Sequence, residues 1–246
     1  MGKEVFNRHE LKYVLDVNHF DDILQDLSQY IVTDPYGDED GFYTISSIYY
    51  DTVDDLFHYE RMKGQTFRQK VRLRTYNKPD NNSDVYLEIK KKFKAVVNKR
   101  RVVMPLNDAY KFLNNDYNNI YELKASNYQI LKEVLFLKSH YKLVPKVTIS
   151  YERQAFIGIK DNDLRITFDS NIRKRKENMG LEKGNYGERY IKSKYLIFEI
   201  KTSKRIPLWL SRILSKYNCC LESFSKYSNS YINLSGDSIQ EIRKVQ

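Results

Sequence analysis

The chain has 246 residues, of which 41% are hydrophobic, so it can bury a full core and is not a disordered chain. Its formal net charge of +10 favours an acidic partner, whether nucleic acid, nucleotide, polyphosphate or a membrane surface. The only cysteines, Cys219 and Cys220, are adjacent, and no stretch reaches the roughly 18 apolar residues that span a bilayer. We therefore expect one cytoplasmic domain over 1–246, without a disulfide framework or zinc site, that reaches a membrane only through a partner.

The first half of the chain predicts strands interrupted by two helices. In chain order we expect a strand at 6–15, a helix at 18–30, a strand at 42–50, a short helix at 51–62 and a meander of strands at 67–77, 84–93 and 98–104. The first helix follows from apolar residues at helical spacing. The strands follow from β-branched and aromatic residues, and the turn after Asn77 from its Pro, Asp and Asn residues.

The second half predicts a helical insertion and then a return to strands. The insertion covers about 107–140, with Asn107 as a cap and a long helix at 121–140. After it we expect strands at 144–158, 163–169 and 194–202, a charged loop at 173–190 and a helix at about 207–217. About eight strands with flanking helices predict an α+β fold, mainly antiparallel β, that forms a closed or nearly closed barrel with a polar interior.

Charged residues recur at every second position in four of these strands. The sets are Arg72 and Arg74, Glu88 with Lys90 and Lys92, Lys99 and Arg101, and Glu199 and Lys201. Residues i and i+2 of a strand point to the same face, so each set shares one face while apolar residues occupy the other. Rows of like charge on neighbouring strands repel unless an anion lies among them, which favours a ligand with several phosphates.

The common catalytic signatures are missing. There is no GxxxxGK[ST], HExxH, GxSxG or kinase signature, and the four histidines lie far apart. Chemistry would then depend on carboxylates and cations, as in phosphoryl transfer assisted by a divalent metal. The tyrosines Tyr13, Tyr49, Tyr50 and Tyr76 are expected to pack, and no base-binding pocket is recognisable.

Nine short segments, in order and spacing, resemble the VTC domain, the polyphosphate polymerase domain of the vacuolar transporter chaperone complex and its stand-alone relatives, within the triphosphate tunnel metalloenzyme superfamily. They are Arg8-His-Glu-Leu-Lys12-Tyr13, Tyr49-Tyr50-Asp51, Val71-Arg72-Leu73-Arg74, Leu87-Glu88-Ile89-Lys90, Lys99-Arg100-Arg101, Tyr151-Glu152-Arg153, Leu164-Arg165-Ile166-Thr167-Phe168-Asp169, Phe198-Glu199-Ile200-Lys201 and Ser225-Lys226-Tyr227.

The resemblance implies an eight-stranded tunnel with a basic lining, in which the γ-phosphoryl group of ATP is transferred to a growing polyphosphate chain with Mn²⁺ or Mg²⁺. The implied phosphate contacts are Lys12, Arg72, Arg74, Lys90, Lys99, Arg153, Arg165 and Lys226, and the implied metal ligand is Glu199. Further expected substrate-binding residues are Arg8, Glu10, Glu88, Arg101 and Lys201, of which the two glutamates would add metal ligands or orient cations.

Three observations qualify these expectations. Arg8 replaces the first carboxylate of the Glu-x-Glu-x-Lys pattern of the hydrolytic branch, which agrees with the VTC domain and weighs against a hydrolase. Ser223 stands where polymerase subunits carry the first of two lysines, which weighs against processive synthesis more than against phosphate binding. Strict alternation puts Arg153 on the face of Val147 and Ile149, so either a bulge intervenes or its inward assignment is wrong.

Three functions therefore stay open. The first is an ATP-dependent polyphosphate polymerase, and the second is a tripolyphosphatase or nucleoside triphosphatase of the same fold, with Glu10 or Glu88 as its base. The third is a polyphosphate- or nucleic-acid-binding module without turnover. Separately, the alternative to a metal role for Glu199 is that of counterion to Lys201 or to an arginine of a neighbouring strand. Nucleic acid is disfavoured because the aromatic residues lie mainly in apolar stripes rather than in a basic groove.

Overall fold

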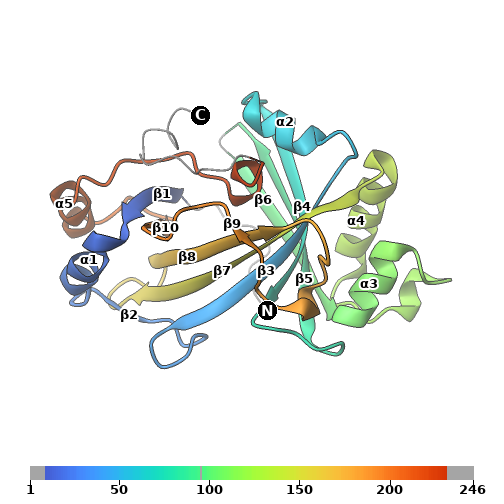
Figure 1. Ribbon diagram of the computed structural model, residues 1–246, viewed down its shortest axis with the longest axis horizontal. Coiled ribbons are helices and arrows are strands. Elements are labelled where there is room, and N and C mark those ends of the chain that lie inside the picture. The colour runs from blue at the N-terminus through green and yellow to red at the C-terminus, as the bar shows by residue number, and fades with distance from the viewer. Residues whose placement is uncertain (1–8, 95, 232–246) are drawn as a thin grey trace. The chain divides into compact units, whose positions relative to one another are not determined.

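The computed structural model describes residues 9–94 and 96–231 (Figure 1). Its strands are β1 (His9–Asp16), β2 (Ile31–Thr33), β3 (Phe42–Asp51), β4 (Phe67–Tyr76), β5 (Asp84–Phe93), β6 (Val96–Pro105), β7 (Val144–Gly158), β8 (Arg165–Arg175), β9 (Glu188–Arg189) and β10 (Tyr195–Thr202). Its helices are η1 (Val17–His19), α1 (Phe20–Leu27), α2 (Leu56–Met62), α3 (Leu106–Asn114), η2 (Ile120–Glu122), α4 (Tyr128–Tyr141), η3 (Leu181–Lys183), α5 (Leu208–Lys216) and α6 (Lys226–Asn229).

The strands hydrogen-bond in the order β1-β10-β8-β7-β3-β4-β5-β6, with β2 on β7 and β9 on β8. The pairs β1–β10, β10–β8, β3–β4, β4–β5 and β5–β6 are all antiparallel. Because this order ends at β1 and β6, hydrogen bonds among the described strands do not complete a ring. The fold is thus α+β and mainly antiparallel, as predicted. In the part of the chain that the structure describes, no helix is both long enough and apolar enough to cross a bilayer.

Contacts divide the chain into two compact units. The described part of the first unit comprises Ile45–Ser150, apart from residue 95, and Lys174–Gly187. The described part of the second comprises 9–44, Tyr151–Arg173 and 188–231. Strands β3 and β7 contribute residues to both units. A single domain over 1–246 stays a prediction.

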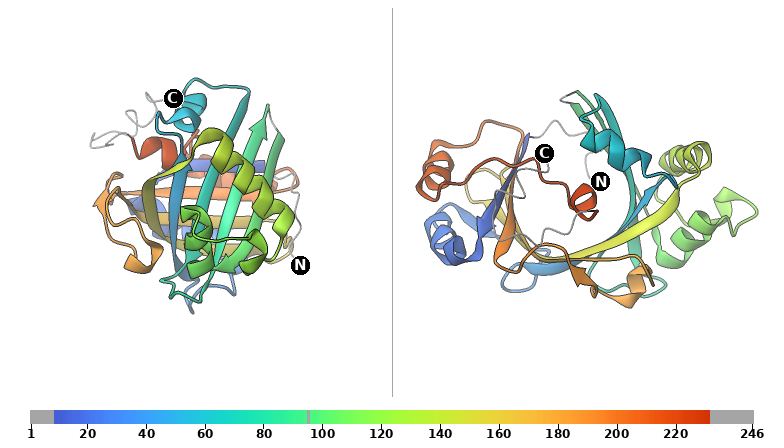
Figure 2. Two further views of the ribbon diagram at one scale, coloured as in Figure 1. Left: turned by 90° about the vertical axis from the view of Figure 1, so that its right-hand side faces the viewer. Right: turned by 45° about the horizontal axis from the view of Figure 1, so that its top comes forward.

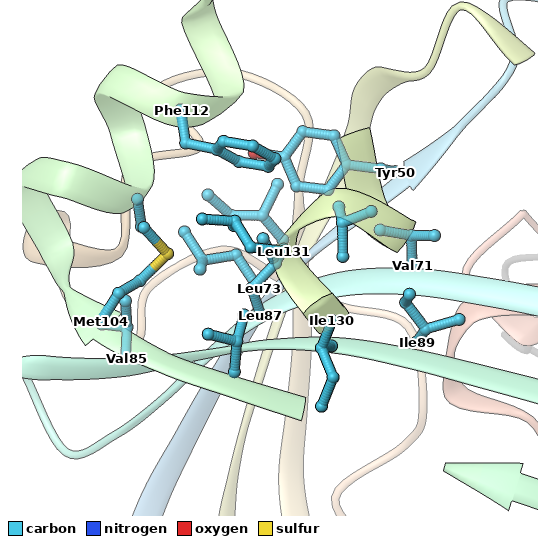
Figure 3. Packing of buried hydrophobic residues seen from close by; sticks show 14 of the residues in the cluster. Tyr50, Val71, Leu73, Val85, Leu87, Ile89, Met104, Phe112, Ile130 and Leu131 are labelled. Carbon is cyan, nitrogen blue, oxygen red and sulfur yellow. The ribbon is translucent and has the colours of Figure 1, made fainter. Parts of the chain in front are cut away.

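The core of the first unit lies between the β4–β5–β6 meander and its helices. Val71, Leu73, Leu87 and Ile89 point to one face of the meander and are almost fully buried (Figure 3). Helices α3 and α4 lie over this face and add Phe112, among others, to the same cluster (Figure 2). Since strand residues alternate between faces, the charged residues of the meander are left on its other face.

The core of the second unit lies between β1, β10, β8 and two helices that lie side by side, α1 and α5 (Figure 1). Tyr13, Phe198 and Phe168 are register partners across the three strands, and the rings of the two phenylalanines stack at 4.7 Å between centroids. Ile23 of α1 and Leu210 of α5 are fully buried against them. Here too the alternate positions carry the charged residues.

Two predicted helices begin later than their apolar patterns suggest. The helix expected at 121–140 is wrong in its first turns, because α4 begins at Tyr128, where the Asn127 side chain accepts a hydrogen bond from the amide of Ile130. The helix expected at 51–62 begins at Leu56. Asp51 is not helical; its buried carboxylate accepts hydrogen bonds from the amides of Phe57 and His58. In both cases a polar side chain fixes the start of the helix.

The charged loop expected at 173–190 is partly strand, since β8 continues to Arg175. The Arg175 guanidinium is buried and donates to four backbone carbonyl oxygens, those of Asn178, Gly180, Gly184 and Tyr186. This single side chain therefore organises the loop after β8. It has a structural role, although its charge belongs to a basic run in the sequence.

Candidate functional site

The first unit presents six cations around one buried glutamate. They lie on the face of the β4–β5–β6 meander opposite its core, and we call this set the first cationic face: Lys70, Arg72, Arg74, Lys90, Lys99, Arg101 and Glu88. The strand register sets them in rows. One row is Arg72, Glu88 and Arg101, and the next is Lys70, Lys90 and Lys99.

Glu88 is the centre of the first cationic face. It is 1% exposed, and its carboxylate lies 2.6 Å from Arg72 Nη2 and 2.5 Å from Lys99 Nζ. Burial would raise the pKa of Glu88, but Arg72, Arg74 and Lys99 outweigh burial and hold this pKa well below its ordinary value. Glu88 is therefore held as an anion that pairs with Arg72 and Lys99.

Hydrogen bonds hold Arg72 and Arg74 of this face in place. Arg72 donates to the Tyr49 hydroxyl at 3.2 Å, and Arg74 donates to the Ser47 hydroxyl at 3.2 Å. Lys99 is influenced mainly by burial, which lowers its pKa to about 8 despite the opposing attraction of Glu88. Among the described residues this face carries six basic side chains beside the Glu88 carboxylate, a composition that suits an anion with several phosphates.

Arg101 belongs to the row of Glu88 but is held differently. Its guanidinium carbon lies 5.2 Å from the centroid of the Tyr86 ring, and its side chain is exposed. Tyr86 is the register partner of Arg74, one same-face position along β5 from Glu88. The sequence expectation grouped Arg101 with Lys99. The structure keeps both residues on one face of β6 and adds the contact between Arg101 and an aromatic side chain.

The second unit carries an ion-pair network in which acids and bases nearly balance. Its members, which we call the second-unit network, are Glu10, Lys12, Arg153, Asp169, Glu199, Lys201 and Lys226. Glu199 accepts ion pairs from Lys201 at 3.0 Å and from Arg153 at 3.5 Å, and Lys12 is its register partner on β1. The pairing of Glu199 with Lys201 considered from the sequence is thus present.

Burial lowers the pKa of both lysines beside Glu199, but the net shift differs between them. It would lower the pKa of Lys12, but Glu199, Glu10 and Asp169 outweigh it and raise this pKa above its ordinary value. Lys12 also lies 2.8 Å from Glu10. For Lys201, burial prevails over the attraction of Glu199 and lowers the pKa. Lys12 is therefore a firmly charged cation, whereas Lys201 is held less strongly in its charged form.

Asp169 is the residue of this network to which the sequence assigned no role. It is fully buried, accepts two hydrogen bonds from Arg153 at 2.6 and 2.8 Å, and lies 2.5 Å from Lys226 Nζ. Lys226 also lies 4.4 Å from the centroid of the Tyr151 ring. Alternation along the strand could have identified Asp169 from the sequence, since it shares a face of β8 with Arg165 and Thr167.

Arg153 contacts Asp169 and Glu199 from β7. Phe156, three positions further along the same strand, belongs to the core of the second unit, so from Arg153 onward the two residues lie on opposite faces, as alternation requires. Arg153 is therefore grouped with the charged residues, and a bulge between it and Ile149 stays a prediction.

Three further residues that the sequence analysis singled out lie elsewhere. Arg165 forms an ion pair with buried Asp34 and donates to the Tyr43 hydroxyl at 3.2 Å, so its described contacts lie outside the second-unit network. Ser223 is exposed. Arg8 lies outside the described residues.

The fit of a divalent cation can be tested on Glu199. The described residues contain no group of three or more His, Cys, Asp or Glu side chains that could hold a metal ion by themselves. Mg²⁺-type sites, however, often use one or two carboxylates together with substrate phosphates. Glu199, whose two carboxylate oxygens pair with Lys201 and Arg153, would be the carboxylate for a cation that arrives with a triphosphate, and Glu10 is the register partner of Lys201 on β1.

Comparison with known proteins assigns the chain to a family. The model of the VTC domain family matches residues 7–235. Vacuolar transporter chaperone complex subunit 4 of Trypanosoma brucei brucei is 24% identical over 96% of this chain and 35% of its own length. The subunit 4 of Schizosaccharomyces pombe is 26% identical over 75% of this chain and 30% of its own length. The chain thus spans about a third of the length of these curated relatives.

Solved structures share the fold. A Bacillus halodurans protein, provisionally named an adenylate cyclase, aligns with a TM-score of 0.55 at 13% identity, over 94% of this chain and all of its own. A Hippeastrum protein, provisionally named an adenylyl cyclase and described by a dominant triphosphatase activity, aligns with a TM-score of 0.51 at 15% identity, over 89% of this chain and 92% of its own. These likenesses confirm the predicted triphosphate tunnel fold.

Proposed function

Since the chain belongs to the VTC domain family, we propose that it is a metal-dependent phosphotransferase that moves the γ-phosphoryl group of ATP onto a growing polyphosphate chain. A terminal phosphate oxygen of the acceptor chain forms the new bond to the γ-phosphorus. The bond between this phosphorus and the oxygen bridging to the β-phosphate breaks, and ADP leaves. A cytoplasmic location is part of the proposal and agrees with the free thiols of Cys219 and Cys220.

One observation carries the proposal, namely the clustering of six basic side chains with Glu88 on the first cationic face. Phosphoryl transfer asks the protein chiefly to position phosphates and to neutralise charge that develops in the transition state. Arg72 and Arg74 are fixed by hydrogen bonds, so they present guanidinium groups in set positions. Fixed guanidinium groups bind phosphate oxygens in pairs with little loss of side-chain freedom.

We assign roles residue by residue. The phosphate-binding residues are Lys12, Arg72, Arg74, Lys90, Lys99, Arg153, Arg165 and Lys226. Glu199 holds the metal, which neutralises charge on the phosphates when bound. Glu10, Glu88 and Lys201 orient the cations, and release of Lys201 from Glu199 would free a carboxylate oxygen for the metal.

A hydrolase of the same fold is the second candidate, favoured by the triphosphatase activity described for the Hippeastrum protein. It would need a carboxylate that accepts a proton from water. Glu88 is a poor base because Arg72 and Lys99 hold it as a carboxylate with a depressed pKa. Glu10 forms an ion pair with Lys12. These contacts favour phosphate over water as the acceptor.

The test is to incubate the pure protein with ATP and Mn²⁺, with and without a short polyphosphate primer, and to measure ADP, orthophosphate and acid-labile polymer together. The proposal expects ADP and polymer. ADP with an equal amount of orthophosphate and no polymer would replace it by the hydrolase. Binding of polyphosphate without ADP formation would leave a binding module, with Ser223 as the first position to change to lysine.

A further inference from the structure

Beyond the phosphate-binding cations, the first cationic face ends in an aromatic cluster. Tyr76 and Tyr86 lie with ring centroids 5.3 Å apart and planes at 84°, and the Arg101 guanidinium lies over the Tyr86 ring. We propose that Tyr76, Tyr86 and Arg101 form the binding site for the nucleobase of the nucleoside triphosphate. This inference rests on the proposed function, because it names where the donor's base is held.

The strand register places this cluster at one end of the phosphate-binding rows. Tyr86 is the register partner of Arg74, and Tyr76 lies two positions beyond Arg74 on the same face of β4. Same-face neighbours on a strand are about 7 Å apart. A nucleotide whose phosphates contact Arg72 and Arg74 therefore has its base within reach of the two tyrosines.

Tyr76, Tyr86 and Arg101 have different roles in the proposed stacking site. Tyr76 is 39% exposed and Arg101 is also exposed, so a ligand in solution can reach both planar groups. Tyr86 is only partly exposed and contacts both of them. We assign Tyr86 as the positioning residue, and Tyr76 and Arg101 as the groups that stack on the base. Bases stack well on both aromatic rings and guanidinium planes.

The end of β4 is fixed in a way that suits this use. The Thr75 hydroxyl donates to the carbonyl oxygens of Tyr76 and Asn77, and Asn77 has a positive φ of 57°. Thr75 itself is buried. The backbone that carries Tyr76 is thereby held at the end of the strand. An exposed aromatic residue on a fixed strand end retains its position when a ligand arrives, which reduces the entropy lost on binding.

This arrangement also gives the nucleotide a direction. The base lies at the Tyr76 end, so the phosphates point toward the row of Lys70, Lys90 and Lys99. Stacking is tolerant of base identity, since every base has a π-face. We therefore expect ATP and GTP to bind with similar affinity.

The experiment compares ATP with inorganic tripolyphosphate, which lacks a base. Their dissociation constants are measured by calorimetry for the wild type and for Tyr76→Leu, Tyr76→Phe and Arg101→Met. Tyr59→Leu is the matched control, because Tyr59 is an exposed tyrosine of the same unit on α2. We expect Tyr76→Leu to weaken ATP about tenfold and tripolyphosphate less than twofold, and Tyr76→Phe and Tyr59→Leu to leave both unchanged.

The outcomes separate the two proposals. If the wild type binds neither compound, the proposed function fails. If it binds both, but Tyr76→Leu and Arg101→Met change ATP and tripolyphosphate by the same factor, the function stands and the base site is refuted. A wild type that binds tripolyphosphate as tightly as ATP would likewise refute it. Tripolyphosphate binding also reports whether each variant is folded.

Discussion

Asp169 is the group whose removal tests the second-unit network most directly. Asp169→Asn keeps the shape of the side chain and removes its charge, leaving Arg153 and Lys226 without their shared carboxylate. Both cations are largely buried, with side chains 9% and 10% exposed. An unpaired buried charge is costly because water no longer solvates it.

The expected effect on stability is large. Breaking a buried ion pair from one side costs roughly 3–5 kcal/mol. For a chain of this size each kcal/mol lowers Tm by about 2–4 °C, so the variant should melt roughly 6–20 °C below the wild type. Because the pKa of Asp169 is lowered in the folded protein by Arg153 and Lys226 against the effect of burial, the difference should be full above about pH 4 and shrink as the pH falls.

Ligand rescue connects this stability to function. If Arg153 and Lys226 bind phosphates, tripolyphosphate replaces the missing carboxylate and raises Tm more for the variant than for the wild type. The assay is thermal unfolding with and without tripolyphosphate, with Asp26→Asn as the control, since Asp26 pairs with Lys216 at the surface. An unchanged Tm for Asp169→Asn would refute the energetic argument. An equal ligand shift in both proteins would remove Arg153 and Lys226 from the phosphate site.

Three further predictions concern the other site residues. Glu199→Gln should abolish Mn²⁺-dependent turnover and leave tripolyphosphate binding intact or tighter; retained turnover in an ATP assay would move the metal to another carboxylate. Burial lowers the pKa of Lys99 to about 8 and bound phosphate favours its charged form, so titration calorimetry should show tripolyphosphate affinity falling as the pH rises above 8. In Lys99→Arg the affinity for tripolyphosphate should not fall over this pH range, because arginine stays charged. An equal fall in this variant would show that Lys99 is not the group whose titration weakens binding. Arg72→Ala or Lys90→Ala should eliminate ADP and polymer together, and loss of only one product would show that these cations do not serve a common step.

The strands could be predicted from the sequence because their apolar period is clear, and the helix starts could not. Leu73 and Leu87 alternate with charged residues, which fixes both the strand type and the buried face. The starts of α2 and α4 depend instead on Asp51 and Asn127. A side chain that reaches amides several residues away leaves little trace in a hydrophobic pattern.

The site was predictable to the extent that it follows alternation along a strand. Arg72 and Arg74 lie on one face as expected, because residues two apart on a strand must do so. The pairing of Lys226 with Asp169 joins residues 57 positions apart, and no local pattern encodes it. Tyr76 was expected to pack. Its exposure depends on the strand ending there, and strand ends are poorly marked in sequence.

The buried carboxylate of Glu88 competes with any bound anion for the cations of the first cationic face. Any anion that binds Arg72 and Lys99 must draw them away from a carboxylate that is already 2.6 and 2.5 Å from them. A chloride ion or a single orthophosphate offers too little charge to replace that contact and neutralise the neighbouring cations as well. A chain of linked phosphates can do both, since its charges arrive together. The face should therefore discriminate by anion valence, and stay available for long substrates amid an excess of small cellular anions.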